Sequence, residues 1–253
     1  MERTCVTYIR AIKLYSVVAL LLACFEAWGQ NKAEVDSLLR VVETTRDAKT
    51  KMRAEVQLGW HFLDNDDGKA LAFSTRGLEL AWQFGDSASI VKAARVKAHS
   101  LRKLNRPNEA IQLYTQVLPI AARNNIIEEQ KKILNGLAVT YTFLAIYDKA
   151  LDYHLQSLVL REAHGTKEEI TVTLNNIGLV YFKMHNYESA LRYYQECVAL
   201  KLEINSHSYL DLIYLNMGLC YLHLRNYTEA KAYTLKGMAV CVNECSTETI
   251  MIG

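Results

Sequence analysis

The stretch TLNNIGLVYFKMHNYESA, from Thr173 to Ala190, decides the fold because its residue spacing returns at intervals of forty residues. Within it, Gly178 precedes Ala190 by twelve positions, and Tyr181 follows Gly178 by three. Shifting by multiples of forty gives related sets: Gly218, Tyr221 and Ala230; Ala138, Tyr141 and Ala150; Ala98 and Ala110; Leu58 and Ala70. Five copies at one fixed period of this size predict a solenoid of stacked repeats.

The composition supports a fully folded, all-helical chain. Of its 253 residues, 51% are hydrophobic and 22% are charged, which is ample apolar material for a core. Only two prolines and eleven glycines occur, and no strand-like alternation is bounded by turn residues. The formal charge of +2 is too small to imply a nucleic-acid or membrane-surface partner.

The period predicts an all-α, right-handed superhelical solenoid of five helical hairpins at residues 51–250. The units are expected at 51–90, 91–130, 131–170, 171–210 and 211–250. Residues 30–50 are expected to form a capping helix, because a single apolar stripe runs along the stretch from Asn31 to Thr44. The stripe consists of Val35, Leu38, Leu39 and Val42.

Local signals for helix ends agree with this period. Short turns are predicted at Asn65-Asp66, Asn105-Arg106, Ala145-Ile146, His185-Asn186 and Arg225-Asn226. Pro107 stands where a second helix begins, a position that tolerates its missing N–H. Gly85 and Gly165 are expected to end second helices, and Thr166 with Glu169 forms a capping box for the next helix.

The small residues of the pattern have a packing explanation. We expect the first helix of a unit to approach its partner closely at Ala138, Gly178 and Gly218. The facing positions are then Ala150, Ala190 and Ala230, and Tyr141, Tyr181 and Tyr221 fill the space beside them. One hairpin buries only one face, so neighbouring hairpins must stack to complete the core.

The pattern L-x-G-L-x-Y followed by Y-x-x-A resembles the tetratricopeptide repeat family over about residues 51–250. The third to fifth units carry it in Leu137-Ala138-Val139-Thr140-Tyr141 with Tyr147 and Ala150, in Ile177-Gly178 with Tyr181, Tyr187 and Ala190, and in Met217-Gly218 with Tyr221, Tyr227 and Ala230. The first two units depart from it at Leu58, His61, Asp67, Leu101 and Pro107. The period of forty is similar to the long-repeat variants typified by kinesin light chains, and the helices should be correspondingly longer than in the standard repeat of about thirty-four residues.

The first 29 residues resemble an export signal. Arg3, Arg10 and Lys13 precede an uncharged apolar run from Leu14 to Phe25, which is too short to span a bilayer. The Ala27-Trp28-Gly29 pattern places the mature start at Gln30 and predicts a periplasmic or secreted protein. Alternatively, Leu21-Leu22-Ala23-Cys24 forms a lipobox with a lipid anchor at Cys24, or the segment is retained as an anchor. No later stretch of eighteen apolar residues exists, so no membrane span is expected in the mature chain.

Four cysteines follow the predicted cleavage site. Cys197 and Cys220 fall on apolar helix faces, where a free thiol behaves as a small hydrophobe, although an oxidising compartment would permit disulfides. Cys241 and Cys245 lie four apart without a histidine at ligand spacing, so no zinc site is expected. Neither a metal nor another cofactor is predicted.

The family resemblance implies a peptide or protein segment bound along a concave surface lined by the first helices. Asparagines often hold the ligand backbone there, and Asn175, Asn176 and Asn216 match those positions, with Asn135 displaced by one. An amide offers both a donor and an acceptor, which an extended backbone needs. The alternative is that these amides satisfy neighbouring helix backbone or one another.

A basic arc is predicted on the first helix of the second unit. It comprises Lys92, Arg95, His99, Arg102, Lys103 and Arg106, which fall within about 100 degrees at 3.6 residues per turn. No acidic residue lies between Lys92 and Arg106. An arc that points into the groove would favour an acidic peptide. The alternative is a solvated face with partial pairing to Glu55.

A non-enzymatic binding scaffold is the function that the sequence favours. No catalytic triad, phosphate-binding loop or metal spacing occurs. The exported form with a DSLLRVVETT-like leading helix also resembles the sensory halves of bacterial membrane histidine kinases and related regulators, so a truncated sensory input domain is the alternative. We further expect a possible homodimer through the last hairpin, because Thr234, Gly237 and Met238 would be left uncovered.

Overall fold

A computed structural model describes residues 32–252, and their side chains from residue 32 to residue 240. Apart from short turns, these residues are helical, and no strand occurs among them. The chain divides into two compact units, Val35–Ser206 and a second that contains His207–Gly253. The signal-peptide region, Cys24 and the side chains of Cys241 and Cys245 lie outside the described part.

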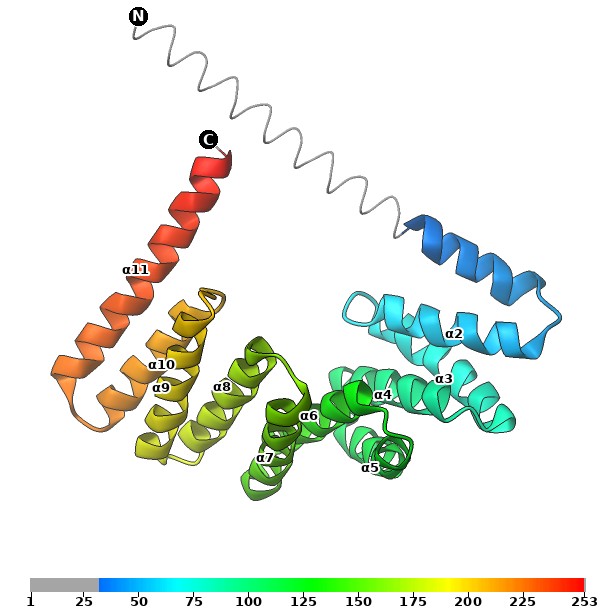
Figure 1. Cartoon of the computed structure of the whole chain (residues 1–253), viewed down its shortest axis with the longest axis horizontal. Coiled ribbons are helices and arrows are strands. Elements are labelled where there is room, and N and C mark those ends of the chain that lie inside the picture. The colour runs from blue at the N-terminus through cyan, green and yellow to red at the C-terminus, as the bar shows by residue number, and fades with distance from the viewer. Residues whose placement is uncertain (1–31, 253) are drawn as a thin grey trace, which may run out of the picture. The chain divides into compact units, whose positions relative to one another are not determined.

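Within each unit, successive helices are antiparallel neighbours (Figure 1). Residues 32–44 are helical, and the stripe predicted there is partly buried. The larger unit then contains α2 (Ala48–Phe62), α3 (Asp67–Phe84), α4 (Ser87–Lys103), α5 (Pro107–Arg123), α6 (Ile127–Phe143), α7 (Tyr147–His164), α8 (Lys167–Lys183) and α9 (Tyr187–Glu203). The second unit contains α10 (Leu210–His223) and α11 (Tyr227–Ile252).

The forty-residue period is visible in the helix bounds. The second helices begin at Asp67, Pro107, Tyr147, Tyr187 and Tyr227, and three first helices begin at Ser87, Ile127 and Lys167. The unit boundaries expected at 91, 131 and 171 therefore fall inside α4, α6 and α8. Dividing the chain just before each of these helices keeps every hairpin whole.

The helix ends are set by short-range chemistry, as predicted. The Thr166 hydroxyl accepts a hydrogen bond from the Glu169 N–H, and the Glu169 carboxylate accepts one from the Thr166 N–H, which completes the capping box. Pro107 is the first residue of α5. Gly85 ends α3 in the left-handed region, with φ of 64°. Gly165 follows α7, but in an extended conformation.

The predicted turns between first and second helices lie where the sequence placed them. Four of them share one conformation, in which a residue other than glycine adopts a left-handed φ near 60°. These residues are Asn105, Ala145, His185 and Arg225. Asparagine and histidine tolerate this region better than other residues with a side chain, so the conformation carries a steric cost at Ala145 and Arg225.

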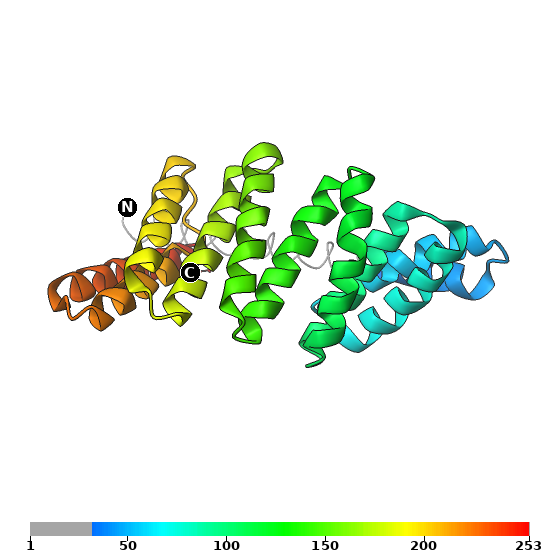
Figure 2. The ribbon, with the colours of Figure 1, turned by 90° about the horizontal axis from the view of Figure 1, so that it is seen from below.

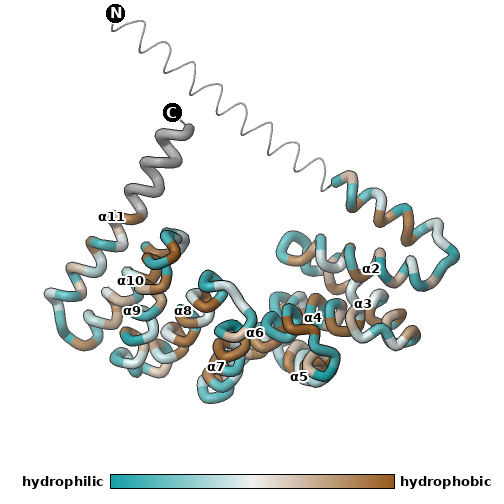
Figure 3. Tube along the Cα trace, in the orientation of Figure 1, coloured by the Kyte–Doolittle hydropathy of each residue, from teal (hydrophilic) through white to brown (hydrophobic). Residues whose placement is uncertain are grey.

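In the larger unit, each helix from α2 to α9 packs against the next, and α4 also contacts both α2 and α6. Figure 2 shows this stack from a second direction, and Figure 3 shows apolar residues recurring along its helices. The small residues of the repeat pattern are fully buried: Ala70, Ala98, Ala110, Ala138, Ala150 and Ala190. Small side chains let the helices approach closely, which is how this unit builds its core.

The close approach at Gly178 has a different cause from the one expected. A Cβ atom at Gly178 would lie 2.7 Å from the Tyr194 ring carbon Cε1. Ala190 is buried as predicted, yet the tyrosine one turn later is what fills the space. The Tyr194 ring therefore lies against α8 of its own hairpin.

Tyrosine pairs recur with the same period beside these contacts. Tyr141 stacks on Tyr153, with ring centroids 5.6 Å apart, and Tyr181 stacks on Tyr193 at 5.4 Å. In the second unit, Tyr221 stacks on a tyrosine of α11 in the same way. These stacks link the two helices of each hairpin. Only the first member of each pair was predicted from the repeat pattern.

In the second unit, one residue of the predicted uncovered face is buried. Gly237 is buried against α10, because a Cβ atom there would lie 2.8 Å from the Asp211 carbonyl oxygen. Met238, in contrast, is 56% exposed. α10 is apolar on all sides, with Leu212, Leu219 and Leu222 exposed. Homodimer formation through this hairpin stays a prediction.

The two described cysteines are core thiols, as expected. Cys197 and Cys220 are buried and free. Burial raises the pKa of the Cys197 thiol to about 11 and that of Cys220 to about 12, so both stay protonated and unreactive. Among the described residues, no helix is long and apolar enough to cross a bilayer.

Candidate functional site

Two adjoining pockets lie along α4, α6 and α8. The first, called here the α4–α6 pocket, has a volume of about 250 Å³ and is lined by Leu63, Asp64, Arg95, His99, Arg102, Tyr114, Lys132, Asn135, Gly136, Val139 and Arg161. The second, the α6–α8 pocket, has a volume of about 370 Å³ and is lined by Arg102, Val139, Thr142, Phe143, His154, Asn176, Leu179 and Lys183. Arg102 and Val139 belong to both, so the pockets are neighbours.

The structure brings together five of the nine predicted site residues. Arg95, His99, Arg102 and Asn135 line the α4–α6 pocket, and Asn176 lines the α6–α8 pocket. The other four do not line either pocket: Lys92, Lys103, Asn175 and Asn216. Asn216 lies on α10 in the second unit.

Much of the basic arc is neutralised by neighbouring elements. The Arg95 guanidinium pairs with the Glu129 carboxylate of α6. Asp64, in the turn after α2, accepts a hydrogen bond from Lys103 at 2.8 Å and lies 3.0 Å from His99 Nε2. The hydrogen bond from Lys103 is the main reason that the pKa of Asp64 lies below its ordinary value. The arc is therefore embedded in ion pairs between hairpins.

The expected pairing of the arc with Glu55 was wrong. The Glu55 carboxylate is buried and accepts hydrogen bonds of 2.9 Å and 3.1 Å from Arg76 Nε on α3. Arg76 belongs to the same hairpin as Glu55 and occupies the carboxylate as its ion-pair partner. Lys92, at the start of the arc, instead lies 5.7 Å from the centre of the Trp60 ring.

Arg102 differs from the rest of the arc. It is half-buried, and no carboxylate among the described residues lies within ion-pair distance of it. It lines both pockets, so its charge is available to a group that enters either one. An uncompensated guanidinium at such a position favours a negatively charged occupant.

Tyr114 contributes a hydroxyl that the sequence analysis missed. The residue is 1% exposed, and its phenolic end lies at Gly136, where a Cβ atom would be 2.5 Å from Cζ and 2.7 Å from the oxygen. The hydroxyl has no hydrogen-bond partner among the described residues. Burial raises the pKa of Tyr114 to about 12, although Arg102 and Arg95 oppose this, so the phenol stays protonated and can donate.

Arg161 reaches the α4–α6 pocket from α7 and was also missed. Its Nε donates to the Ser157 hydroxyl at 3.2 Å, and Nη1 donates to the Glu169 carbonyl at 3.1 Å. Burial lowers the pKa of this guanidinium, while Glu169 and Glu128 counteract the effect. The side chain is thus fixed in place and adds a further cation to the pocket wall.

His154 lines the α6–α8 pocket from α7. It is 1% exposed, and its Nδ1 atom has no hydrogen-bond partner among the described residues. Burial and the nearby Arg161 lower its pKa to about 4, so the imidazole is neutral at pH 7. The α6–α8 pocket therefore has an uncharged floor.

Two of the asparagines bond to one another, as the alternative expectation held, and their role in holding a ligand backbone stays a prediction. Asn176 Nδ2 donates to Asn135 Oδ1 at 3.4 Å, a long hydrogen bond between neighbouring first helices. Both side chains are only half-buried and line the pockets. The Asn175 Oδ1 atom is buried and has no partner within the described part of the chain. The long bond leaves both groove amides able to exchange this contact for one to a ligand.

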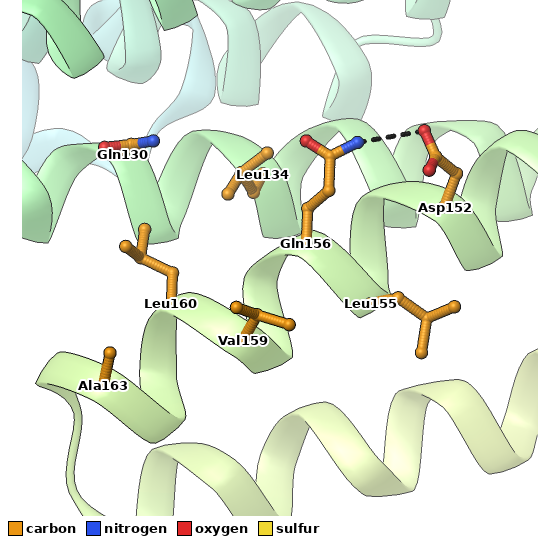
Figure 4. Close-up of a pocket in the computed structure, with 8 residues that line it drawn as sticks. All are labelled: Gln130, Leu134, Asp152, Leu155, Gln156, Val159, Leu160 and Ala163. Carbon is orange, nitrogen blue, oxygen red and sulfur yellow. Dashed lines mark hydrogen bonds between the residues drawn. The ribbon is translucent and has the colours of Figure 1, made fainter.

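A third depression lies between α6 and α7 and has a volume of about 450 Å³ (Figure 4). Its walls are largely apolar, with Leu155 and Val159 exposed, and Gln156 donates to Asp152 at its edge at 3.0 Å. None of the predicted site residues lines it. No group of three or more histidine, cysteine, aspartate or glutamate side chains in the described residues is placed to hold a metal ion.

The fold places the chain among all-α solenoids of stacked helical hairpins. Solved structures with this fold include BtubC (BKLC) from P. vanneervenii, with a TM-score of 0.72, 17% identity, and coverage of 85% of this chain and 90% of that one. A putative kinesin light chain with TPR-like repeats from Podosopora anserina has a TM-score of 0.68, 14% identity, and coverage of 80% and 100%. A Rap protein complexed with competence and sporulation factor has a TM-score of 0.57, 12% identity, and coverage of 84% and 70%.

The tetratricopeptide repeat family matches residues 130–203 and, separately, residues 212–238. These two ranges contain tetratricopeptide repeats, as the repeat pattern predicted for them. The matched ranges cover α6 to α9 in the larger unit and most of α10 and part of α11 in the second. No curated protein is a significant match to the sequence.

Proposed function

We propose that this protein is a binding scaffold, and that the two pockets along α4, α6 and α8 hold an acidic segment of a protein partner. The observation that carries the proposal is Arg102, a half-buried cation shared by both pockets that has no carboxylate partner in the described part of the chain. Arg161 and the Tyr114 hydroxyl converge on the same pocket. Several donors around one cavity favour a carboxylate-rich ligand.

Other features support an extended segment as the form of the ligand. The two pockets follow successive first helices, and each contains an asparagine amide that can bond to a peptide backbone. A Rap protein of the same fold is known in complex with competence and sporulation factor. We propose an exported, periplasmic or secreted location for this binding, because the amino terminus has the pattern of an export signal.

Selection from a displayed library of random twelve-residue peptides tests the proposal. We expect selected peptides to be enriched in aspartate and glutamate, and their binding to weaken as salt increases. Arg102→Glu should abolish binding of the selected peptides. Arg123→Glu makes the same charge change at an exposed position of α5 and should leave binding intact. Selection without acidic enrichment, or equal effects of the two variants, would contradict the proposal.

A further inference from the structure

The two pockets differ in chemistry, although they share Arg102 and Val139. The α4–α6 pocket has the donors Arg161, Lys132 and the Tyr114 hydroxyl around it. The α6–α8 pocket is walled by Val139, Leu179 and Phe143, above the neutral His154. Phe143 is 60% exposed, which is unusual for a phenylalanine and leaves its ring free to contact a ligand.

We infer that the groove recognises a pair of side chains, a carboxylate in the α4–α6 pocket and an apolar side chain in the α6–α8 pocket, at positions two apart in an extended segment. This inference rests on the proposed function and specifies its ligand. Alternate side chains of an extended chain point the same way and are separated by about 7 Å. Two pockets that share wall residues suit that spacing, whereas adjacent side chains point in opposite directions.

The carboxylate is assigned to the α4–α6 pocket because its donors have unused capacity. The Tyr114 hydroxyl has no partner among the described residues, and Arg102 lacks an ion-pair partner there. Lys132 also lies at this pocket, with a half-exposed side chain that is 3.5 Å from Glu129. The cavity of about 250 Å³ has room for a carboxylate side chain, and its charged lining disfavours an apolar one.

The apolar side chain is assigned to the α6–α8 pocket because its cations lie at the edge. Arg102 is shared with the first pocket, and Lys183 is exposed, so its ammonium can turn to solvent. Apart from these two cations, the residues that line the pocket are uncharged. Burying an apolar side chain against Phe143 and Leu179 removes apolar surface of both partners from water.

The test uses synthetic nine-residue glycine–serine peptides that contain Glu-x-Phe, Phe-x-Glu, adjacent Glu-Phe, Glu alone or Phe alone. Binding to the purified chain is measured by fluorescence polarisation. We expect one of the two alternating peptides to bind at least about tenfold more tightly than the adjacent pair and than either single residue. Equal binding of the alternating and adjacent peptides would overturn the inference.

Two variants test which ligand side chain enters which pocket. Tyr114→Phe removes only the unpartnered hydroxyl and should weaken the alternating peptide about tenfold without changing the Phe-only peptide. Phe143→Ser should weaken peptides that contain Phe and leave the Glu-only peptide unchanged. Val159→Ser is the control, since Val159 is an exposed apolar residue of the depression between α6 and α7. If neither variant distinguishes the peptides, the assignment is wrong.

The outcomes separate this inference from the proposed function. Peptides with several acidic residues that bind in an Arg102-dependent way, without any preference for the alternating pair, would overturn the inference and leave the proposed function standing. Absence of binding by every acidic peptide would refute both.

Discussion

His154 should make the stability of the larger unit depend on pH between 5 and 6.5. Its pKa is 6.5 when unfolded and about 4 when folded, because burial and Arg161 disfavour the charged imidazole. The unfolded chain therefore binds a proton that the folded chain does not. Stability is full above pH 6.5 and falls as pH drops toward 4, by about 3 kcal/mol in total. Between pH 7.5 and pH 5, the expected loss is about 2 kcal/mol.

The cationic surroundings of His154 reinforce this direction. Arg161 lies on its own helix, while Arg102 of α4 and Lys183 of α8 line the same pocket. The carboxylates Asp64 and Glu169 have lowered pKa values, so the stability they contribute is lost as pH falls below their unfolded pKa values of about 4. Urea unfolding at pH 7.5, 6.0 and 5.0 therefore reports mainly on histidines. Burial also lowers the pKa of His99, which adds a decline of the same sign, so the His154 variant is needed to separate the two.

The matched comparison is His154→Gln against His164→Gln, an exposed histidine at the end of the same helix. His154→Gln should remove most of the decline between pH 7.5 and pH 5, and His164→Gln should retain it. A proton NMR titration of His154 gives its pKa directly. A folded-state value near 6.5, or an unchanged decline in His154→Gln, would refute the reasoning.

Three further changes test the packing. Gly178→Ala forces a Cβ atom against the Tyr194 ring and should destabilise the protein by about 1 to 3 kcal/mol in thermal unfolding. Gly68→Ala is the control: its Cβ atom would meet nothing closer than 3.4 Å, so this variant should be neutral or stabilising. Ala145→Gly relieves a left-handed φ of 57° and should raise stability by up to about 1 kcal/mol; a lower melting temperature would contradict this. Met238→Asp should turn a dimer into a monomer in light scattering, and an unmodified chain that is strictly monomeric at tens of micromolar would exclude self-association.

The helices and turns of this protein could be predicted from the sequence because their causes are local. The capping box at Thr166, proline at the first position of α5 and glycine after α3 each act within one helical turn. Even the missed tyrosine stacks carried a signal, since Tyr153 and Tyr193 follow the same period as Tyr141 and Tyr181. The cysteines were placed correctly for the same reason, as an apolar helix face is a local pattern.

The lining of the two pockets was predicted only in part. Arg95, His99 and Arg102 were found because they cluster on one helix face, which sequence spacing reveals. Partial pairing of this face was foreseen only with Glu55, whereas the carboxylates that contact Arg95 and His99 are Glu129 and Asp64, which come from other elements. The prediction of the outer face of the last hairpin was wrong at Gly237 for a related reason. Gly237 and Tyr194 lie at positions that could face either neighbour, and spacing alone does not distinguish them.

The sequence by itself determined the repeat, the helical hairpins and the basic face of α4, since these follow from periodicity and from contacts within a few residues. Only the tertiary structure decided which groups surround the pockets. The Tyr114 hydroxyl reaches the groove because Gly136 of the next hairpin lacks a side chain, and Arg161 does so because Glu169 and Ser157 hold it. Such contacts depend on how far one hairpin is rotated and shifted against the next, which is set by the fit of many side chains together.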